Sequence, residues 1–173
     1  MKNIIFFISL LMLISCESSS LLTSKKESIK CPTVLFAAEH KKYLGSNEST
    51  IDVDRIAYKA EINNYNFSEG CFIIDNTFTA YLSILFIVKP MMEEQNIITL
   101  PFYLAILDNE KKIRDIQYYY LEGNFNKNWE SETKEFVETD LSKTISVKIL
   151  DVDEMMTIII GFMLDKKQLE ILN

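Results

Sequence analysis

Hydrophobic and polar residues alternate with a period of two through most of the chain. Residues 56–62 alternate in this way, and residues 155–164 do so again near the C-terminus. Such alternation is typical of strands with one buried and one exposed face. The longest example is 78–88, where six apolar residues share one side of an extended chain: Phe78, Ala80, Leu82, Ile84, Phe86 and Val88.

The remaining apolar segments are short and bounded by turn signals. Further strands are expected at 34–38, 71–75, 102–107, 113–121, 132–139 and 145–149. Segment 102–107 is apolar on both faces, which predicts a central position in a sheet. Residues 40–50 are expected to form a loop and residues 63–70 a turn-rich connection. Asp165 is expected to cap a helical turn over 166–172.

This order of elements predicts an all-β fold. Roughly eight short strands with almost no helix are typical of an antiparallel β-sandwich of immunoglobulin-like type. The lack of crossover helices argues against a parallel α/β fold. A closed β-barrel is the alternative.

The alternation is absent at the N-terminus, where residues 4–14 are almost continuously apolar after Lys2. This run has no polar face and is shorter than the roughly 20 residues of a spanning helix, so it is typical of a signal-peptide core. Leu13-Ile14-Ser15-Cys16 looks like a bacterial lipobox, which implies cleavage before Cys16 and lipid on that cysteine. An ordinary secretory signal and an uncleaved anchor are the alternatives.

Three parts follow along the chain. Residues 1–15 are interpreted as a lipoprotein signal peptide, 16–30 as the lipidated cysteine with a polar, serine-rich flexible tether, and 31–173 as one β-sandwich domain. The expected location is the cell envelope, on a membrane and facing the periplasm. Glu17 after the cysteine favours the outer membrane, by comparison with sorting in enterobacterial lipoproteins.

The charge of the chain limits its partners. Without residues 1–15, which contain one lysine, the chain has 17 basic and 25 acidic residues and a net charge of −8. An acidic chain lacks the basic patch that nucleic acids and anionic lipids require. We therefore expect no nucleic-acid partner, and membrane attachment through lipid chains at the N-terminus.

Two further cysteines follow Cys16. Cys31 and Cys71 form an even pair in a chain expected to be exported, which favours a disulfide. Two free thiols or a two-ligand metal site are the alternatives. With His40 as the only histidine, the chain has too few ligands of this kind for a closed tetrahedral zinc site, and no metal is expected.

Three segments carry a resemblance: CPTVLF at 31–36, IAYKAEINNYNFSEGC at 56–71 and IIIGFMLDKKQLEILN at 158–173. Together they resemble a group of alphaproteobacterial lipoproteins that have no assigned function. Those proteins share a Cys-Pro after the tether, a strand that ends in a second cysteine and a closing strand with a Gln-Leu turn. The resemblance implies an extracytoplasmic address and supports the Cys31–Cys71 pair, but it implies no catalytic residue.

The chain contains no recognisable catalytic motif. It has four glycines and no phosphate-binding or dinucleotide-binding pattern, so no cofactor is expected. His40 has no nucleophile elbow with it, and the acidic residues around Asp52 and Asp54 do not match a calcium loop. A binding surface is expected instead from aromatic residues. Tyr118, Tyr119 and Tyr120 alternate within a strand, so at least one should point away from the core, and Tyr103 and Trp129 are expected near them.

These observations favour a non-enzymatic, lipid-anchored module that binds an envelope protein. A carrier for an apolar ligand or lipid is the alternative, because an all-β fold can enclose a cavity. A carboxylate-dependent envelope hydrolase is a third hypothesis, and it would need two acidic side chains that converge in one cleft.

Overall fold

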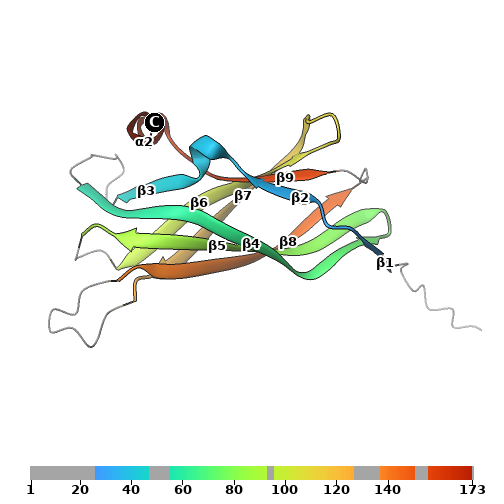
Figure 1. The fold of residues 1–173 in the computed structure, drawn as a ribbon, viewed down its shortest axis with the longest axis horizontal. Helices are drawn as coiled ribbons and strands as arrows, with labels where there is room; N and C mark the ends of the chain where they lie inside the picture. Colours follow the sequence, from blue (N-terminus) through green and yellow to red (C-terminus); the bar gives the residue numbers. More distant parts are fainter. Residues whose placement is uncertain (1–25, 47–54, 93–95, 127–136, 151–155, 173) are drawn as a thin grey trace, which may run out of the picture.

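The computed structural model describes residues 26–46, 55–92, 96–126, 137–150 and 156–172. These residues form two β-sheets that pack face to face, with one short helix close to the C-terminus (Figure 1). The predicted all-β sandwich is confirmed, and within the described residues the two sheets do not close into a barrel.

Sheet A contains five strands and is antiparallel throughout. In the order β1-β4-β5-β8, each strand pairs with the next, and β3 also pairs with β4. The strands are β1 (Lys26–Ile29), β3 (Lys42–Ser46), β4 (Ile56–Ile74), β5 (Thr77–Pro90) and β8 (Thr139–Leu150).

Sheet B contains four strands in the order β2-β9-β6-β7. The β2–β9 pair is parallel, whereas β9–β6 and β6–β7 are antiparallel. Segment 102–107 belongs to β6, and its predicted central position is confirmed. The strands are β2 (Thr33–Phe36), β6 (Ile97–Leu107), β7 (Ile113–Asn124) and β9 (Thr157–Phe162), and two helical elements accompany them, η1 (Ala38–His40) and α2 (Lys166–Leu172).

The core lies between the sheets and consists of the predicted alternating side chains. All six apolar residues of the 78–88 face are fully buried. From sheet B, Phe102 and Phe162 place their ring centroids 5.2 and 5.7 Å from that of Phe86. The period-two pattern of the sequence therefore identified the inner face of the long strand correctly.

Two connections link sheet A to sheet B or to the segment that leads into it. The predicted disulfide links Cys31, between β1 and β2, to Cys71 in β4, with the Cα atoms 5.1 Å apart. At the other connection, the Tyr58 hydroxyl donates to the carbonyl of Thr99 at 2.7 Å and accepts from the Thr99 N–H at 3.0 Å. Burial raises the pKa of Tyr58 to about 12, although its hydrogen bonding to Thr99 lowers it.

Several predicted boundaries were wrong. Residues 26–29, assigned to the flexible tether, form β1 and pair with the end of β4, so the sheet begins before Cys31. Strand β3 lies inside the predicted loop 40–50. The turn-rich segment 63–70 is part of β4, where irregularities in the pairing after Ile62 and after Phe67 accommodate extra residues.

The C-terminal helix is capped as predicted. The side chain of Asp165 accepts from the N–H of Gln168 at 2.7 Å, and the Gln168 side chain accepts from the N–H of Asp165 at 2.9 Å. This reciprocal arrangement is a capping box. The buried Gln168 amide also donates to the carbonyl of Leu44 at 2.8 Å, which fixes α2 against β3.

Candidate binding surface

The outer side of sheet B carries apolar and aromatic side chains. Tyr118 and Tyr120 of β7 are each 63% exposed, and Leu35 of β2 is 52% exposed. Their neighbours in sequence on the opposite side of each strand, such as Leu121 and Val34, are buried in the core. We call this surface the aromatic face and define it by Leu35, His40, Tyr103, Ile116, Tyr118, Tyr120 and Ile159.

The strand pairing brings these residues together from all four strands. Leu35 lies beside Ile159, and Ile159 lies beside Ala105, whose partner in β7 is Ile116. The next row places Tyr103 beside Tyr118. The aromatic face is therefore continuous across sheet B from β2 to β7.

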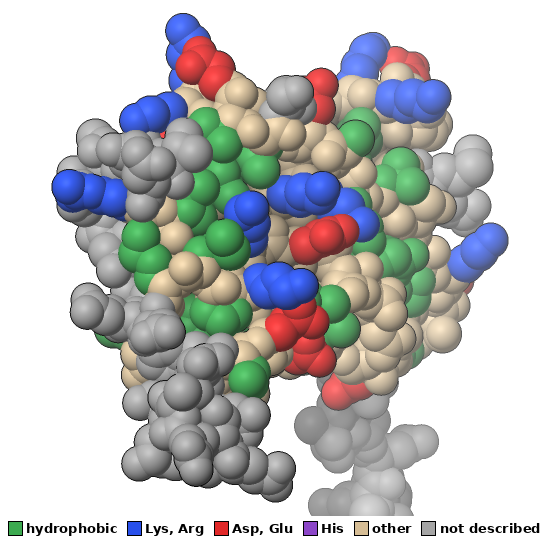
Figure 2. Space-filling model, turned by 60° about the vertical axis from the view of Figure 1, so that its left-hand side comes forward, with side chains coloured by type: hydrophobic (Ala, Val, Ile, Leu, Met, Phe, Trp, Pro, Cys, Tyr) green, Lys and Arg blue, Asp and Glu red, His purple; other side chains and the backbone are tan. Residues whose placement is uncertain are grey.

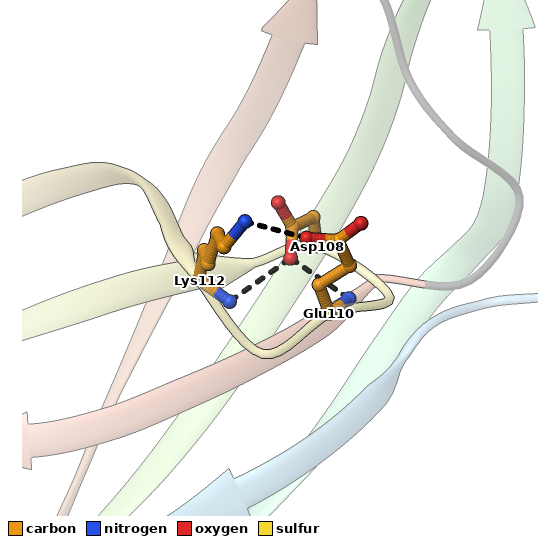
Figure 3. Close-up of polar contacts among 3 residues, drawn as sticks. All are labelled: Asp108, Glu110 and Lys112. Atoms are coloured by element: carbon orange, nitrogen blue, oxygen red, sulfur yellow. Dashed lines mark hydrogen bonds and ion pairs between the residues drawn. The ribbon is translucent and has the colours of Figure 1, made fainter.

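The turn between β6 and β7 fixes this pairing (Figure 3). One carboxylate oxygen of Asp108 accepts from the N–H groups of Glu110 and Lys112, both at 2.9 Å, and the Lys112 side chain pairs with Glu110 at 2.6 Å. Lys111 has a positive φ of 63°, as tight turns of this kind require. A defined turn keeps the two strands in one register, so the tyrosines on β6 and β7 stay adjacent.

His40 and Tyr103 pack together over a glycine. The Nδ1 of His40 donates to the carbonyl of Phe162 at 2.9 Å, and the imidazole ring meets Tyr103 edge-on with centroids 5.8 Å apart. A Cβ atom on Gly161 would lie 2.7 Å from the Tyr103 hydroxyl oxygen and 2.9 Å from the His40 Cβ. Burial raises the pKa of Tyr103 above its ordinary value.

The predicted tyrosines divide between the two sides of β7. Tyr118 and Tyr120 point outward, as expected for at least one of them. Tyr119 points toward the core, where its ring stacks on Phe102 with centroids 5.4 Å apart and its hydroxyl donates to Gln117 at 2.8 Å. Burial, followed by the nearby carboxylate of Asp115, raises the pKa of Tyr119. Tyr119 is therefore not on the aromatic face.

Other predicted residues fall elsewhere. Trp129 and Cys16 lie outside the described residues, as does most of the predicted strand 132–139, of which Thr139 begins β8. His40 was interpreted as a surface loop residue, yet it is partly buried on the aromatic face. The positions of His40 and Gly161 beside Tyr103 on this face depend on the pairing of β9 with β6. No local sequence pattern specifies that pairing, so the sequence could not predict them.

The outer side of sheet A is mixed: polar and charged residues predominate, but Tyr81 and Leu150 are also exposed there, at 40% and 73%. A hydroxyl row crosses it, in which Ser83 lies 3.0 Å from Ser68 and 2.6 Å from Thr144, oxygen to oxygen. An open groove of about 670 Å³ lies beside it over β3, β4 and β5. Two of the carboxylates near this groove are ion-paired, Glu61 with Lys41 at 2.9 Å and Glu138 with Lys89 at 3.3 Å. Figure 2 shows a side of the molecule on which side chains of opposite charge lie close together among hydrophobic ones.

Comparisons with known proteins found no match. The chain matches no family model, no curated protein and no solved structure at a significant level. Among the described residues, no group of three or more His, Cys, Asp or Glu side chains is placed to hold a metal ion. No helix in the described part is long and apolar enough to cross a membrane.

Proposed function

We propose that this chain is a lipid-anchored extracytoplasmic protein of the bacterial envelope, whose sandwich domain binds a protein partner through the aromatic face. The observation that supports it most is the pair Tyr118 and Tyr120, which are the most exposed aromatic side chains among the described residues. The lipobox sequence that ends at Cys16 supports the anchoring. No catalytic step is part of this proposal.

The aromatic face has the properties of a protein interface. Tyrosine is enriched at such interfaces because it offers a large apolar area and a hydroxyl group, and because few rotatable bonds become fixed on binding. Tyr118 and Tyr120 stand on a strand that is paired with β6 along its length, so their backbone is already ordered. Binding then orders only the side chains, which keeps the entropy cost small.

The charges around the face favour a protein over a nucleic acid or a lipid surface. Arg114 and Glu122 lie on the same strand on either side of the two tyrosines, and the turn beyond them carries Glu110 and Lys112. Charges of both signs at the edge of an apolar surface are typical of a protein interface with a polar rim. A phosphate backbone or an anionic membrane would instead need a surplus of positive charge.

The two alternative functions receive less support. A carrier for an apolar molecule would use an enclosed cavity, whereas the groove over sheet A is open, and lysine and glutamate side chains lie in its lining beside leucine and isoleucine. A carboxylate-dependent hydrolase would use two acidic side chains that act together. In this groove Glu61 and Glu138 each pair with a different lysine.

Site-specific photo-crosslinking in intact cells tests the binding proposal. A photoreactive phenylalanine analogue replaces Tyr118 in the full-length chain, and the matched control carries it at Tyr81, which is 40% exposed on the outer side of sheet A. We expect the same heavier adduct in repeated experiments at position 118 and none at 81. We also expect Tyr120→Ser to reduce the yield at 118. Adducts of equal yield at both positions, or none at either, would contradict the proposal.

Lipid attachment is tested separately at Cys16. Cells that express the full-length chain receive a labelled fatty acid, and we expect the wild type to carry the label. The Cys16→Ser variant should lose the label and accumulate as an uncleaved precursor. A labelled, shortened Cys16→Ser protein would show that the lipobox interpretation is wrong.

A further inference from the structure

An edge strand of sheet B, β7, differs from an edge strand of sheet A, β8, in the charges that it carries. Within the described residues β7 pairs only with β6, and β8 pairs only with β5. Edge strands normally carry charges or proline, which prevent pairing with another chain. Strand β8 has such charges along its length, at Asp140, Lys143 and Lys148. The centre of β7, from Ile116 to Leu121, has neither a charge nor a proline.

The outward side chains of β7 are complementary to themselves. In order they are Arg114, Ile116, Tyr118, Tyr120 and Glu122. If a second β7 runs antiparallel with Tyr118 opposite its own copy, Arg114 lies opposite Glu122 at both ends and Ile116 lies opposite Tyr120. Both charged residues are exposed, and neither has an ion-pair partner within the described part of the chain.

Another register loses this match. With the axis moved to Tyr119, Arg114 would face Asn124 and Ile116 would face the carboxylate of Glu122. With the axis at Tyr118, the core-side row places Gln117 opposite Tyr119, two side chains that already hydrogen-bond to each other within one chain. The register centred on Tyr118 is therefore the better one on both sides of the strand.

We propose that two copies of this chain pair through their β7 strands, antiparallel and with a two-fold axis at Tyr118, to form one continuous sheet of eight strands. Such an interface is isologous, because each copy presents the same strand to the other. An axis perpendicular to the sheet leaves both aromatic faces on the same side. This inference goes beyond the proposed function, since the dimer presents one aromatic surface of double width and leaves no β7 edge exposed.

Charge reversal tests the register. Full-length protein in detergent is analysed by sedimentation velocity over a range of concentrations, and we expect the wild type to form dimers. Arg114→Glu and Glu122→Arg should each raise the dimer dissociation constant roughly tenfold or more, because like charges then lie opposite each other. The double variant Arg114→Glu/Glu122→Arg should restore wild-type dimerisation. The matched control is Lys148→Glu on β8, which changes the net charge as Arg114→Glu does and should have no effect.

Cysteine cross-linking tests the axis independently. Tyr118→Cys in the full-length chain should give a disulfide-linked dimer on non-reducing gels, because the two residues meet at the axis. Tyr120→Cys should not, since its partner is Ile116. A chain that is monomeric at every concentration, or dimers that tolerate the 114 and 122 single variants and do not cross-link at 118, would overturn the proposal. A monomer that still gives a heavier photo-adduct with another protein at 118 would overturn the dimer alone and leave the proposed function standing.

Discussion

Both sheets bury the same kind of inner face, yet their outer faces differ. Sheet A presents the hydroxyl row of Ser68, Ser83 and Thr144 and a groove with paired lysine and glutamate residues. Sheet B presents Tyr118 and Tyr120 beside aliphatic residues. On sheet A the exposed Tyr81 and Leu150 lie among polar residues, whereas the apolar residues of sheet B form one continuous row across its strands. The outer face of an antiparallel sheet can be solvated, so folding alone does not require such a continuous apolar surface.

This difference indicates which exposed side chains serve a function rather than the stability of the fold. Apolar side chains that remain exposed in the described structure gain nothing from the core and increase the risk of association. Five predictions separate these two contributions. They begin with the connections that both sheets share and end with the outer faces alone.

The largest effect is expected from the disulfide. Cys71→Ala removes the covalent link between β4 and the segment just before β2, which closes a loop of 40 residues. On the chain-entropy model this should lower the free energy of unfolding by about 4 kcal/mol. Urea denaturation under oxidising conditions measures it, and strong reductant should bring the wild type down to the variant. Equal stability of the two proteins under oxidising conditions would contradict the expectation.

Tyr58→Phe tests the second connection between the sheets. The substitution removes both hydrogen bonds between the Tyr58 hydroxyl and the backbone N–H and C=O of Thr99. This loss should lower the free energy of unfolding by about 1–3 kcal/mol. The exposed Tyr118→Phe is the matched control and should change it by less than about 0.5 kcal/mol.

The same residue predicts a pH dependence. The pKa of Tyr58 is about 12 in the folded chain and about 10 when unfolded, so between these values the unfolded state binds fewer protons. The contribution of Tyr58 to the free energy of unfolding should therefore be constant below pH 10 and fall by about 2–3 kcal/mol toward pH 12. Chemical denaturation at several pH values measures the slope. Tyr58→Phe should reduce it without removing it, because burial also raises the pKa of Tyr43, Tyr103 and Tyr119.

Gly161→Ala disturbs only the aromatic face. The added methyl group would overlap Tyr103 and His40, so one of them must move, at a cost of about 1–3 kcal/mol in the free energy of unfolding. Chemical denaturation compares it with Ser146→Ala on the outer side of sheet A, which should be nearly neutral. We expect partner cross-linking at Tyr118 to weaken in the glycine variant. Unchanged cross-linking would show that His40 and Tyr103 do not shape the binding surface.

The smallest effect on stability is expected from Tyr118→Ser and Tyr81→Ser. Each variant replaces one exposed tyrosine by serine, Tyr118 on the outer side of sheet B and Tyr81 on the outer side of sheet A. Each should change the free energy of unfolding by less than about 0.5 kcal/mol. They should differ in association, because only Tyr118→Ser removes a residue of the aromatic face. Denaturation together with co-purification from detergent extracts distinguishes the two effects. Equal loss of association in both variants would remove the contrast between the faces.

Local patterns predicted β5 and the helix cap, because each leaves a signal close by in sequence. The disulfide was predicted from the even pair of cysteines rather than from a local pattern, and β4, the longest strand, was predicted only in part. The alternation in 78–88 identified the buried side of β5, and the spacing of Asp165 and Gln168 fits the cap. The short edge strands β1 and β3 carry mostly polar residues, so they resembled a tether and a loop. In β3, the ring of Tyr58 lies against Gly45 and leaves no room for a side chain there.

The candidate site was predictable only within one strand. Alternation in β7 indicated that some tyrosines point outward, and two of them do. The segment 102–107 was interpreted as central because it is apolar on both sides, and that position is correct. Its second apolar side, however, belongs to the aromatic face rather than to a second core. Which residues from β2, β9 and η1 join that face depends on pairing between distant strands, and this information is not local.

The parallel pairing of β2 with β9 has a consequence for the order in which the chain can fold. Thr33 pairs with Thr157, and β9 lies between β2 and β6 in sheet B. The four strands of sheet B therefore cannot form one sheet until β9, the last strand, has been synthesised. Strands β1, β3, β4, β5 and β8 all precede β9, so sheet A can assemble first, together with the bond between Cys31 and Cys71. Contacts between such distant segments form slowly. In a chain that emerges N-terminus first, sheet B is therefore completed only by its final residues. Loss of β9 would leave β2 without its partner and reduce sheet B to the β6–β7 pair, while every strand of sheet A would remain present.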